Sequence, residues 1–127
     1  MQTANEVLPL VIQKYDNIKK QKNEIIKAEQ ELQVTLSDNN TFENYVVLKQ
    51  KLNEALSKFY KSIEELEETG VVMKGLDQGL LDFPSKRFDQ EVWLCWKEGE
   101  TEIKFWHEKD SGFNGRKPVS VDAESLI

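Results

Sequence analysis

The residues best suited to chemistry are concentrated in one stretch, which runs from Val92 to Arg116 and reads VWLCWKEGETEIKFWHEKDSGFNGR. It holds all three tryptophans, the single cysteine and the single histidine of the 127-residue chain. Three interpretations are open: the aromatic core of a small sheet, a metal or acid–base site, and a pocket for an anion. The first can coexist with either of the others, because aromatic side chains bury about 150 to 250 Å² each and a small sheet needs that area.

A metal site would draw on side chains near the only histidine. His107, Glu108 and Asp110 carry groups that bind divalent ions. Asp82 would add a carboxylate from a neighbouring strand, and Cys95 is a further candidate ligand. No HExxH or CxxC spacing is present, and adjacent residues of a strand point to opposite faces, so the pattern has low specificity. A hydrogen-bonded structural role for the histidine stays open, and no cofactor follows from the sequence.

An anion pocket would use the glycine-punctuated segment SGFNGRK, residues 111–117. Gly112 and Gly115 supply flexible backbone amides. Arg116 and Lys117 add positive charge beside them, a combination that suits phosphate or carboxylate. The alternative is a structural arginine that pins this loop to the sheet through a two-pronged ion pair. Its candidate carboxylate partners are Asp82, Glu100 and Glu108.

Cys95 would serve as a nucleophile only with a base within hydrogen-bond reach. Its neighbours Leu94 and Trp96 are apolar and predict a buried, inert thiol. No other catalytic spacing is recognisable, so whether the protein is an enzyme stays open.

Two long helical patterns precede this stretch. The first has seam positions at steps of three and four: Leu8, Val11, Tyr15, Ile18, Lys22, Ile25, Glu29, Leu32 and Leu36. The second follows turn residues at 36–41 and ends at Gly70; its stripe contains Tyr45, Leu48, Leu52, Ala55, Phe59, Ile63 and Leu66, widened by Val46, Leu56 and Tyr60. The short connection predicts that the two helices are antiparallel neighbours.

After Gly70 the pattern changes to short β-branched and aromatic runs. The expected strands are VVMK, LLDFP, EVWLCWK and TEIKFWH, the last two joined at EGE with Gly99 in the turn. The third strand is apolar on both faces and is expected at the centre of the sheet. We therefore predict an α+β fold, with a long antiparallel helical hairpin at residues 1–70 followed by a small antiparallel β-sheet of about four strands at residues 71–127. The second part includes the glycine-rich loop and a polar tail, and the whole is expected to form one compact unit.

The charge and the apolar pattern narrow the range of partners. A formal net charge of −6 argues against nucleic-acid binding, because phosphate contacts need a basic surface. No apolar run reaches the roughly 18 to 20 residues of a membrane span. A single cysteine needs no oxidising compartment, so a cytoplasmic location is expected. The apolar stripe of the second helix is wider than one helix covers, which predicts a homodimer that forms a four-helix bundle.

These features favour a cytoplasmic, non-enzymatic interaction or scaffold module with a protein partner. The alternative is a small enzyme or ligand-binding protein with a metal or anion site between Trp106 and Arg116.

Three segments of the second half also match a known pattern: GVVMKGLDQGLLDFP at residues 70–84, EVWLCWKEGE at 91–100 and FWHEKDSGFNGRKP at 105–118. They resemble a prokaryotic family known only as domain-of-unknown-function family 2203, and ANEVLP near the start is similar to its opening segment. The resemblance covers almost the whole chain and implies no reaction. It implies a cluster of residues that merits testing: Asp82, Cys95, Trp96, Glu100, Trp106, His107, Glu108, Gly115 and Arg116.

Overall fold

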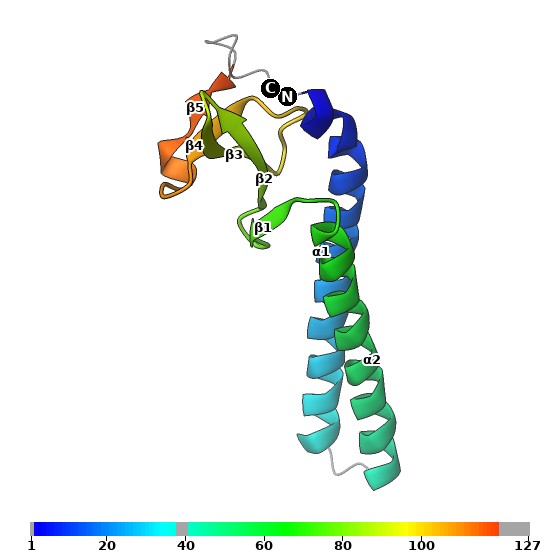
Figure 1. Ribbon diagram of the computed structural model, residues 1–127. Coiled ribbons are helices and arrows are strands. Elements are labelled where there is room, and N and C mark those ends of the chain that lie inside the picture. Colours follow the sequence, from blue (N-terminus) through cyan, green and yellow to red (C-terminus); the bar gives the residue numbers. More distant parts are fainter. Residues whose placement is uncertain (1, 38–40, 120–127) are drawn as a thin grey trace. The chain divides into compact units, whose positions relative to one another are not determined.

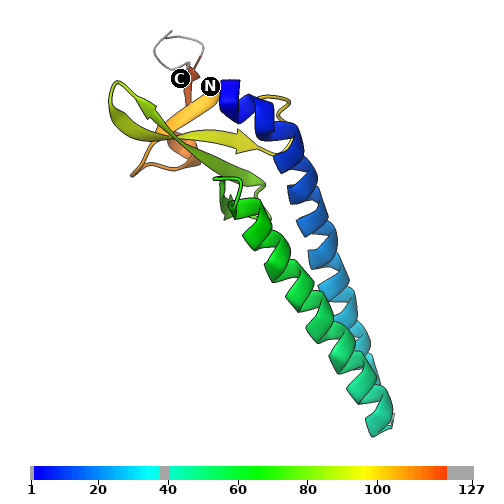
Figure 2. The same ribbon diagram turned by 45° about the vertical axis from the view of Figure 1, so that its right-hand side comes forward.

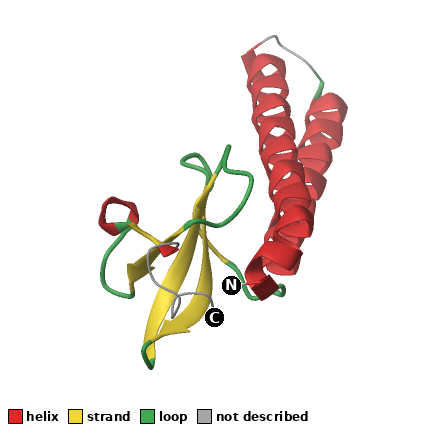
Figure 3. Cartoon of the chain, turned by 90° about the horizontal axis from the view of Figure 1, so that it is seen from above, coloured by secondary structure: helices red, strands yellow, loops and turns green. Residues whose placement is uncertain are grey.

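The computed structural model describes residues 2–37 and 41–119, in which two helices precede an antiparallel sheet (Figures 1 and 3). The elements are α1 (Gln2–Ser37), α2 (Phe42–Glu67), β1 (Val72–Gly75), β2 (Leu80–Arg87), β3 (Gln90–Lys97), β4 (Phe105–Glu108), the 3-10 turn η1 (Phe113–Gly115) and β5 (Lys117–Pro118). The predicted α+β class is confirmed. Contacts divide the chain into two compact units: Gln13–Glu65 form one, and the other described residues form the second. The predicted polar tail after residue 119 lies outside the described residues.

The unit Gln13–Glu65 is an antiparallel pair of helices, which run side by side in Figures 1 and 2. Its core consists of Ile25, Ala28, Leu32 and Leu52. The half-buried residues packed against this core are Tyr45, Leu48, Ala55, Leu56 and Phe59. The predicted hairpin is therefore present. Within the described residues, no helix combines the length and the apolar character needed to cross a membrane.

The seam of α1 differs from the predicted one at two positions. Glu29 is exposed, and Ala28 is buried in its place. The steps from Ile25 to Ala28 and Leu32 keep the helical spacing, whereas an unpaired glutamate would be costly to bury. Leu36 is 64% exposed, so the seam ends before it.

The sheet has five antiparallel strands in the order β1-β2-β3-β4-β5, one more than predicted. The additional strand is β5, whose two residues pair with Phe105 and Trp106 of β4. Two residues leave no periodic signal in a sequence, which is why the strand was not predicted. β3 lies at the centre of the sheet, as its two apolar faces predicted.

A two-residue turn, Phe88–Asp89, joins β2 to β3. Both residues have positive φ, 51° and 64°. Positive φ at both central residues is typical of a type I′ turn, which usually takes Asn-Gly or Asp-Gly. Phe88 therefore adopts a conformation that is unfavourable for a bulky side chain.

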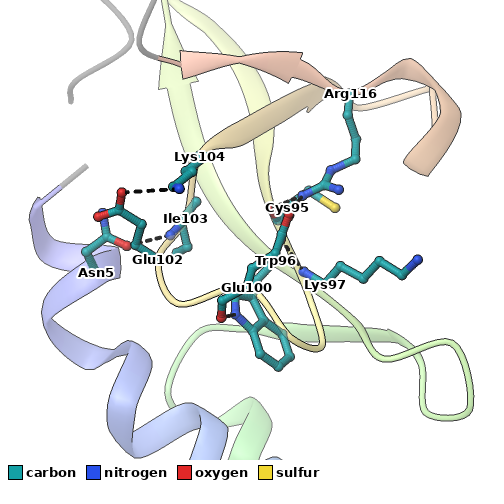
Figure 4. Close-up of polar contacts among 9 residues, drawn as sticks. All are labelled: Asn5, Cys95, Trp96, Lys97, Glu100, Glu102, Ile103, Lys104 and Arg116. Carbon is teal, nitrogen blue, oxygen red and sulfur yellow. Dashed lines mark hydrogen bonds and ion pairs between the residues drawn. The ribbon is translucent and has the colours of Figure 1, made fainter.

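The connection from β3 to β4 is longer than predicted. Cys95 pairs with Phe105, so β4 begins only at Phe105 and the placement of Ile103 in the last strand was wrong. Ile103 is nevertheless buried, and its amide donates a hydrogen bond to Asn5 Oδ1 at 2.8 Å (Figure 4). This bond joins the first turns of α1 to the β3–β4 connection within the same compact unit.

The two faces of the sheet differ in chemistry, because side chains alternate along each strand. One face carries the residues of a dry core, each at most 7% exposed: Leu81, Phe83, Val92, Leu94, Trp96 and Trp106. The opposite face carries three buried groups with polar or ionisable atoms, Asp82, Cys95 and His107.

Candidate functional site

Three neighbouring strands bring Asp82, Cys95 and His107 together on one face. Asp82 lies directly opposite Cys95 in the β2–β3 register. His107 lies opposite Trp93 in the β3–β4 register, and Trp93 shares a face with Cys95 because the two are separated by one residue. The three residues are only 2%, 1% and 3% exposed, respectively. Water therefore contributes little to stabilising charge in this cluster.

Both ring nitrogens of His107 have partners. Nδ1 lies 2.8 Å from the backbone carbonyl oxygen of Glu108, and because a carbonyl oxygen only accepts, Nδ1 carries a proton. Nε2 lies 3.0 Å from Asp82 Oδ2. In a neutral ring protonated at Nδ1, Nε2 is an acceptor that would face another acceptor. The geometry therefore requires either a proton or a bound cation between these two atoms.

The Asp82 carboxylate interacts with the Cys95 thiol, which contributes to the raised pKa of that thiol, but one of its oxygens accepts no hydrogen bond of good geometry. Its Oδ1 is buried and has no hydrogen-bond partner among the described residues, which is a costly state for a carboxylate. The ligand atoms of Asp82, Cys95 and His107 all lie within 4.8 Å of one another. A tetrahedral ion with bonds of about 2.0 to 2.3 Å holds its ligands about 3.3 to 3.7 Å apart. Small side-chain movements would therefore close this cluster around an ion.

Cys95 is a poor nucleophile in this setting. Burial raises the pKa of its thiol from 9.0 to about 12, and the negative charge of Asp82 is the next cause. His107 cannot take the thiol proton, because both its nitrogens are engaged elsewhere. A metal ion would supply the positive charge that the thiolate otherwise lacks.

The cluster lines a pocket of about 260 Å³. The other lining residues are Lys74, Leu80, Trp93, Lys109, Ser111, Gly112 and Phe113. The Nζ atoms of Lys74 and Lys109 lie 4.4 Å and 3.4 Å, respectively, from the centroid of the Trp93 ring. The pocket thus combines the buried cluster with one aromatic ring and two cations.

Glu108 and Lys117 lie on the opposite face of the sheet, the face that carries Trp106. Lys117 Nζ donates a hydrogen bond to Glu108 Oε1. This hydrogen bond, followed by the positive charge of Lys117, lowers the pKa of Glu108. The structure therefore separates Glu108 from the other candidate metal ligands, and it gives Lys117 a carboxylate partner.

The remaining candidates of the glycine-rich segment do not form a single site. Asp110 is exposed and does not belong to the group of ligand atoms described above. Gly112 lines the pocket, whereas Gly115 donates its amide to the carbonyl oxygen of Gly112 at 2.9 Å. Of the four candidate anion residues, only Gly112 borders the pocket.

Arg116 is held by Glu100. Its Nη2 donates to both carboxylate oxygens of Glu100, each at 2.7 Å, and to the Cys95 carbonyl oxygen at 3.3 Å (Figure 4). The guanidinium also lies 4.0 Å from the centroid of the Phe105 ring. Of the two roles considered for Arg116, the geometry supports the structural one. A single nitrogen makes the pair, rather than the guanidinium fork.

Trp96 and Glu100 stabilise the β3–β4 connection. Trp96 is buried, and its Nε1 donates to the backbone carbonyl oxygen of Glu100 at 2.8 Å (Figure 4). Glu100 Oε1 accepts the backbone amide of Lys97 at 2.7 Å. Trp96 and Trp106 therefore belong to the dry core, and Glu100 belongs to the loop that borders it.

Four residues that line the pocket were not identified from the sequence: Lys74, Leu80, Trp93 and Lys109. Lys74 lies where the register between β1 and β2 shifts, and such an irregularity has no signature in a single sequence. The alternation along β3 does contain a signal for Trp93, because it shares the face of Cys95.

Fold and site together define an α+β protein with a helical hairpin, a five-stranded sheet and a candidate ligand pocket on that sheet. The chain belongs to the family described as Uncharacterized conserved protein (DUF2203), whose model matches residues 1–119. The family resemblance seen in the sequence is thereby confirmed. No curated protein and no solved structure matches the chain.

Proposed function

We propose that the sheet binds a divalent metal ion of the zinc class through Asp82, Cys95 and His107. The observation that carries this proposal is the orientation of His107. Its Nδ1 is committed to the Glu108 carbonyl, which leaves the lone pair of Nε2 directed at Asp82. Metal-bound histidines usually donate their other ring nitrogen to a carbonyl or carboxylate in this way, because the bond fixes the tautomer and the ring orientation.

The donor types support this choice of ion. A thiolate, an imidazole and a carboxylate suit zinc better than the oxygen-preferring ions magnesium and calcium. The charges of thiolate and carboxylate would also balance the two positive charges of the ion, which matters in a site this buried. Three protein ligands leave a fourth position for water or a substrate, as in catalytic zinc sites. All three ligands line the pocket, so such a molecule has a route to the ion.

The proposal can be tested on protein purified without a histidine tag. We expect one equivalent of Zn²⁺ after reconstitution, and Co²⁺ in its place should give a thiolate-to-metal charge-transfer band. The band should disappear in Cys95→Ser. Asp82→Asn and His107→Gln should weaken Zn²⁺ binding by at least about tenfold, because each removes a direct ligand.

Glu108→Gln and Asp110→Asn provide matched controls for these variants. Both remove a charge near His107 in the sequence, but neither side chain belongs to the cluster, so Zn²⁺ binding should be retained. A reconstituted protein that holds no zinc and gives no Co²⁺–thiolate band contradicts the proposal. His107 and Asp82 would then form a proton-bridged structural pair.

We also propose that the helical hairpin is an interaction module that forms a homodimer in a prokaryotic cytoplasm. The supporting observation is a group of large apolar residues on the helices near their connection, each 56% to 77% exposed: Val34, Leu36, Phe42 and Val47. A groove of about 510 Å³ includes Val34 and Leu48. A second copy packed on this groove would cover it on both partners at once, because a two-fold interface uses the same patch twice, and the result would be a four-helix bundle.

Light scattering tests the assembly. The unmutated protein should have the mass of a dimer at micromolar concentration, and Val34→Glu combined with Val47→Glu should shift it to a monomer. Lys20→Glu changes an exposed charge elsewhere on α1 and should leave the dimer intact. A monodisperse monomer of the unmutated protein contradicts the dimer proposal without affecting the metal proposal.

A further inference from the structure

We infer that the pocket on the sheet binds a small oxyanion, a phosphate or carboxylate group, which Lys74 and Lys109 hold beside Trp93. This site differs from the glycine-rich segment around Arg116 that the sequence suggested. It rests on the proposed metal site only in part: a bound ion would provide one more ligand position for the same anion, while the two lysines act with or without it.

Lys74 and Lys109 are cations that have no carboxylate partner among the described residues. Each contacts the ring of Trp93, and in the described part of the chain neither forms an ion pair. Lys104 and Lys117, by contrast, are paired with glutamates. Two lysines without carboxylate partners therefore line one pocket of a chain whose net charge is −6.

The two lysines also repel each other. Both ammonium nitrogens lie close to the same ring centroid, so their separation is below the Debye length of roughly 8 Å at physiological ionic strength. Salt therefore screens this repulsion incompletely. An oxyanion that accepts hydrogen bonds from both ammonium groups would relieve the repulsion and gain charge-assisted hydrogen bonds.

The buried cluster of Asp82, Cys95 and His107 adds no net negative charge that would repel an anion in the pocket. In the metal-free protein, one proton between His107 Nε2 and Asp82 Oδ2 satisfies their contact and leaves the pair without net charge. In the metal-bound protein, the ion would balance the thiolate and the carboxylate. The lysines therefore give the pocket net positive charge in both states.

The size of the pocket restricts the ligand further. Its volume of about 260 Å³ lies below the roughly 300 to 1,000 Å³ typical of pockets for drug-sized molecules. Inorganic phosphate or a short carboxylic acid fits this volume better than a nucleotide.

Trp93 provides the readout, because an anion bound beside its ring should change the indole fluorescence. Metal-free and Zn²⁺-loaded protein would be titrated with inorganic phosphate and, in a parallel arm, with succinate, so that the preferred oxyanion is identified. We expect a saturable response to at least one of them. Trp93→Phe should lose the fluorescence response, while calorimetry on that variant should still detect binding.

Substitution of each lysine tests its role. Lys74→Gln and Lys109→Gln should each weaken binding by roughly tenfold, the loss of one charge-assisted hydrogen bond. Lys104→Gln removes the same charge from a residue outside the pocket and should bind like the unmutated protein. Far-ultraviolet circular dichroism would establish that all three variants are folded.

Two outcomes overturn the inference: equal affinity in all three lysine variants, or no saturable response to either anion in both metal states. The Zn²⁺ content of the same samples is measured separately and tests the metal proposal. A protein that binds zinc but neither anion contradicts only the oxyanion site. A protein that binds phosphate through both lysines but holds no zinc contradicts only the metal site.

Discussion

Arg116 Nη2 lies 2.7 Å from each carboxylate oxygen of Glu100, and the same guanidinium lies over the ring of Phe105. The contact joins the segment after η1 to the β3–β4 connection. The two side chains are only 12% and 23% exposed, so solvent screens the pair weakly.

Arg116→Met should lower the free energy of unfolding by about 1.5 to 3 kcal/mol, because it leaves the largely buried Glu100 carboxylate without its charged donor. Arg116→Lys should cost less, since one nitrogen makes the pair, but it loses the contact with Phe105. Urea denaturation measures both. Lys117→Met, which breaks a neighbouring but solvent-exposed pair, should cost clearly less than Arg116→Met, because solvent screens that pair. Equal losses in Arg116→Met and Lys117→Met would contradict a structural role for Arg116.

Cys95 predicts a specific alkaline instability of the metal-free protein. Its pKa is raised from 9.0 to about 12 in the folded state, so the unfolded thiol loses its proton first as the pH rises. The stabilisation from the neutral buried thiol is fully present below pH 9.0 and is lost between that pH and about 12. The difference in unfolding free energy between the unmutated protein and Cys95→Ala should therefore shrink from pH 8 to pH 11. A difference that stays constant over this range would show that the thiol is not held neutral.

Glu108 predicts the opposite behaviour at acidic pH. Its pKa is lowered by the hydrogen bond from Lys117 and by the charge of that lysine, so its contribution is present above the ordinary value of 4.5 and is lost as the pH falls through the lowered pKa. Lys117→Gln should move the pKa of Glu108 upward. Carboxyl chemical shifts in an NMR titration measure this directly, and an unchanged pKa would rule out the pair in solution.

The turn at Phe88–Asp89 predicts a stabilising substitution. Both residues have positive φ, which Asn and Gly tolerate far better than Phe does. Replacing Phe88–Asp89 by Asn-Gly should raise the free energy of unfolding by about 0.5 to 1 kcal/mol. Phe88→Ala, which removes the exposed ring but keeps a Cβ, should not give this gain. A loss of stability in the Asn-Gly variant would instead indicate that the Phe88 ring, over which the Arg87 guanidinium lies, contributes to the fold.

The parts of the fold that a sequence predicts well are those with long periodic signals. The seam from Leu8 to Leu32 and the stripe around Leu52 predicted the hairpin, and β-branched and aromatic runs predicted four of the strands. The fifth strand, the late start of β4 and the turn at Phe88–Asp89 depend on register and on strained backbone. Neither has a local signature in one sequence.

The sequence identified the three side chains of the buried cluster by their type but not their arrangement. His107, Asp82 and Cys95 were recognised as possible ligands from their chemistry, but only the register shows that these three converge and that Glu108 does not. Lys74 was not recognised, because its place in the pocket depends on an irregular strand end. Long-range pairing of this kind is a property of the folded sheet and not of any short segment.

The hydrogen bond from the Ile103 amide to Asn5 has a consequence for the order of events during synthesis. Residues 2–12 are translated before the helical hairpin is complete, yet their partners in the same compact unit begin only at Leu66. The helical hairpin has most of its contacts within one continuous stretch, so it can form while the sheet is still being translated. The first turns of α1 can then contact the β3–β4 connection only after that connection has been translated, and the pocket is completed only once residues 111–113, which follow β4, have been made.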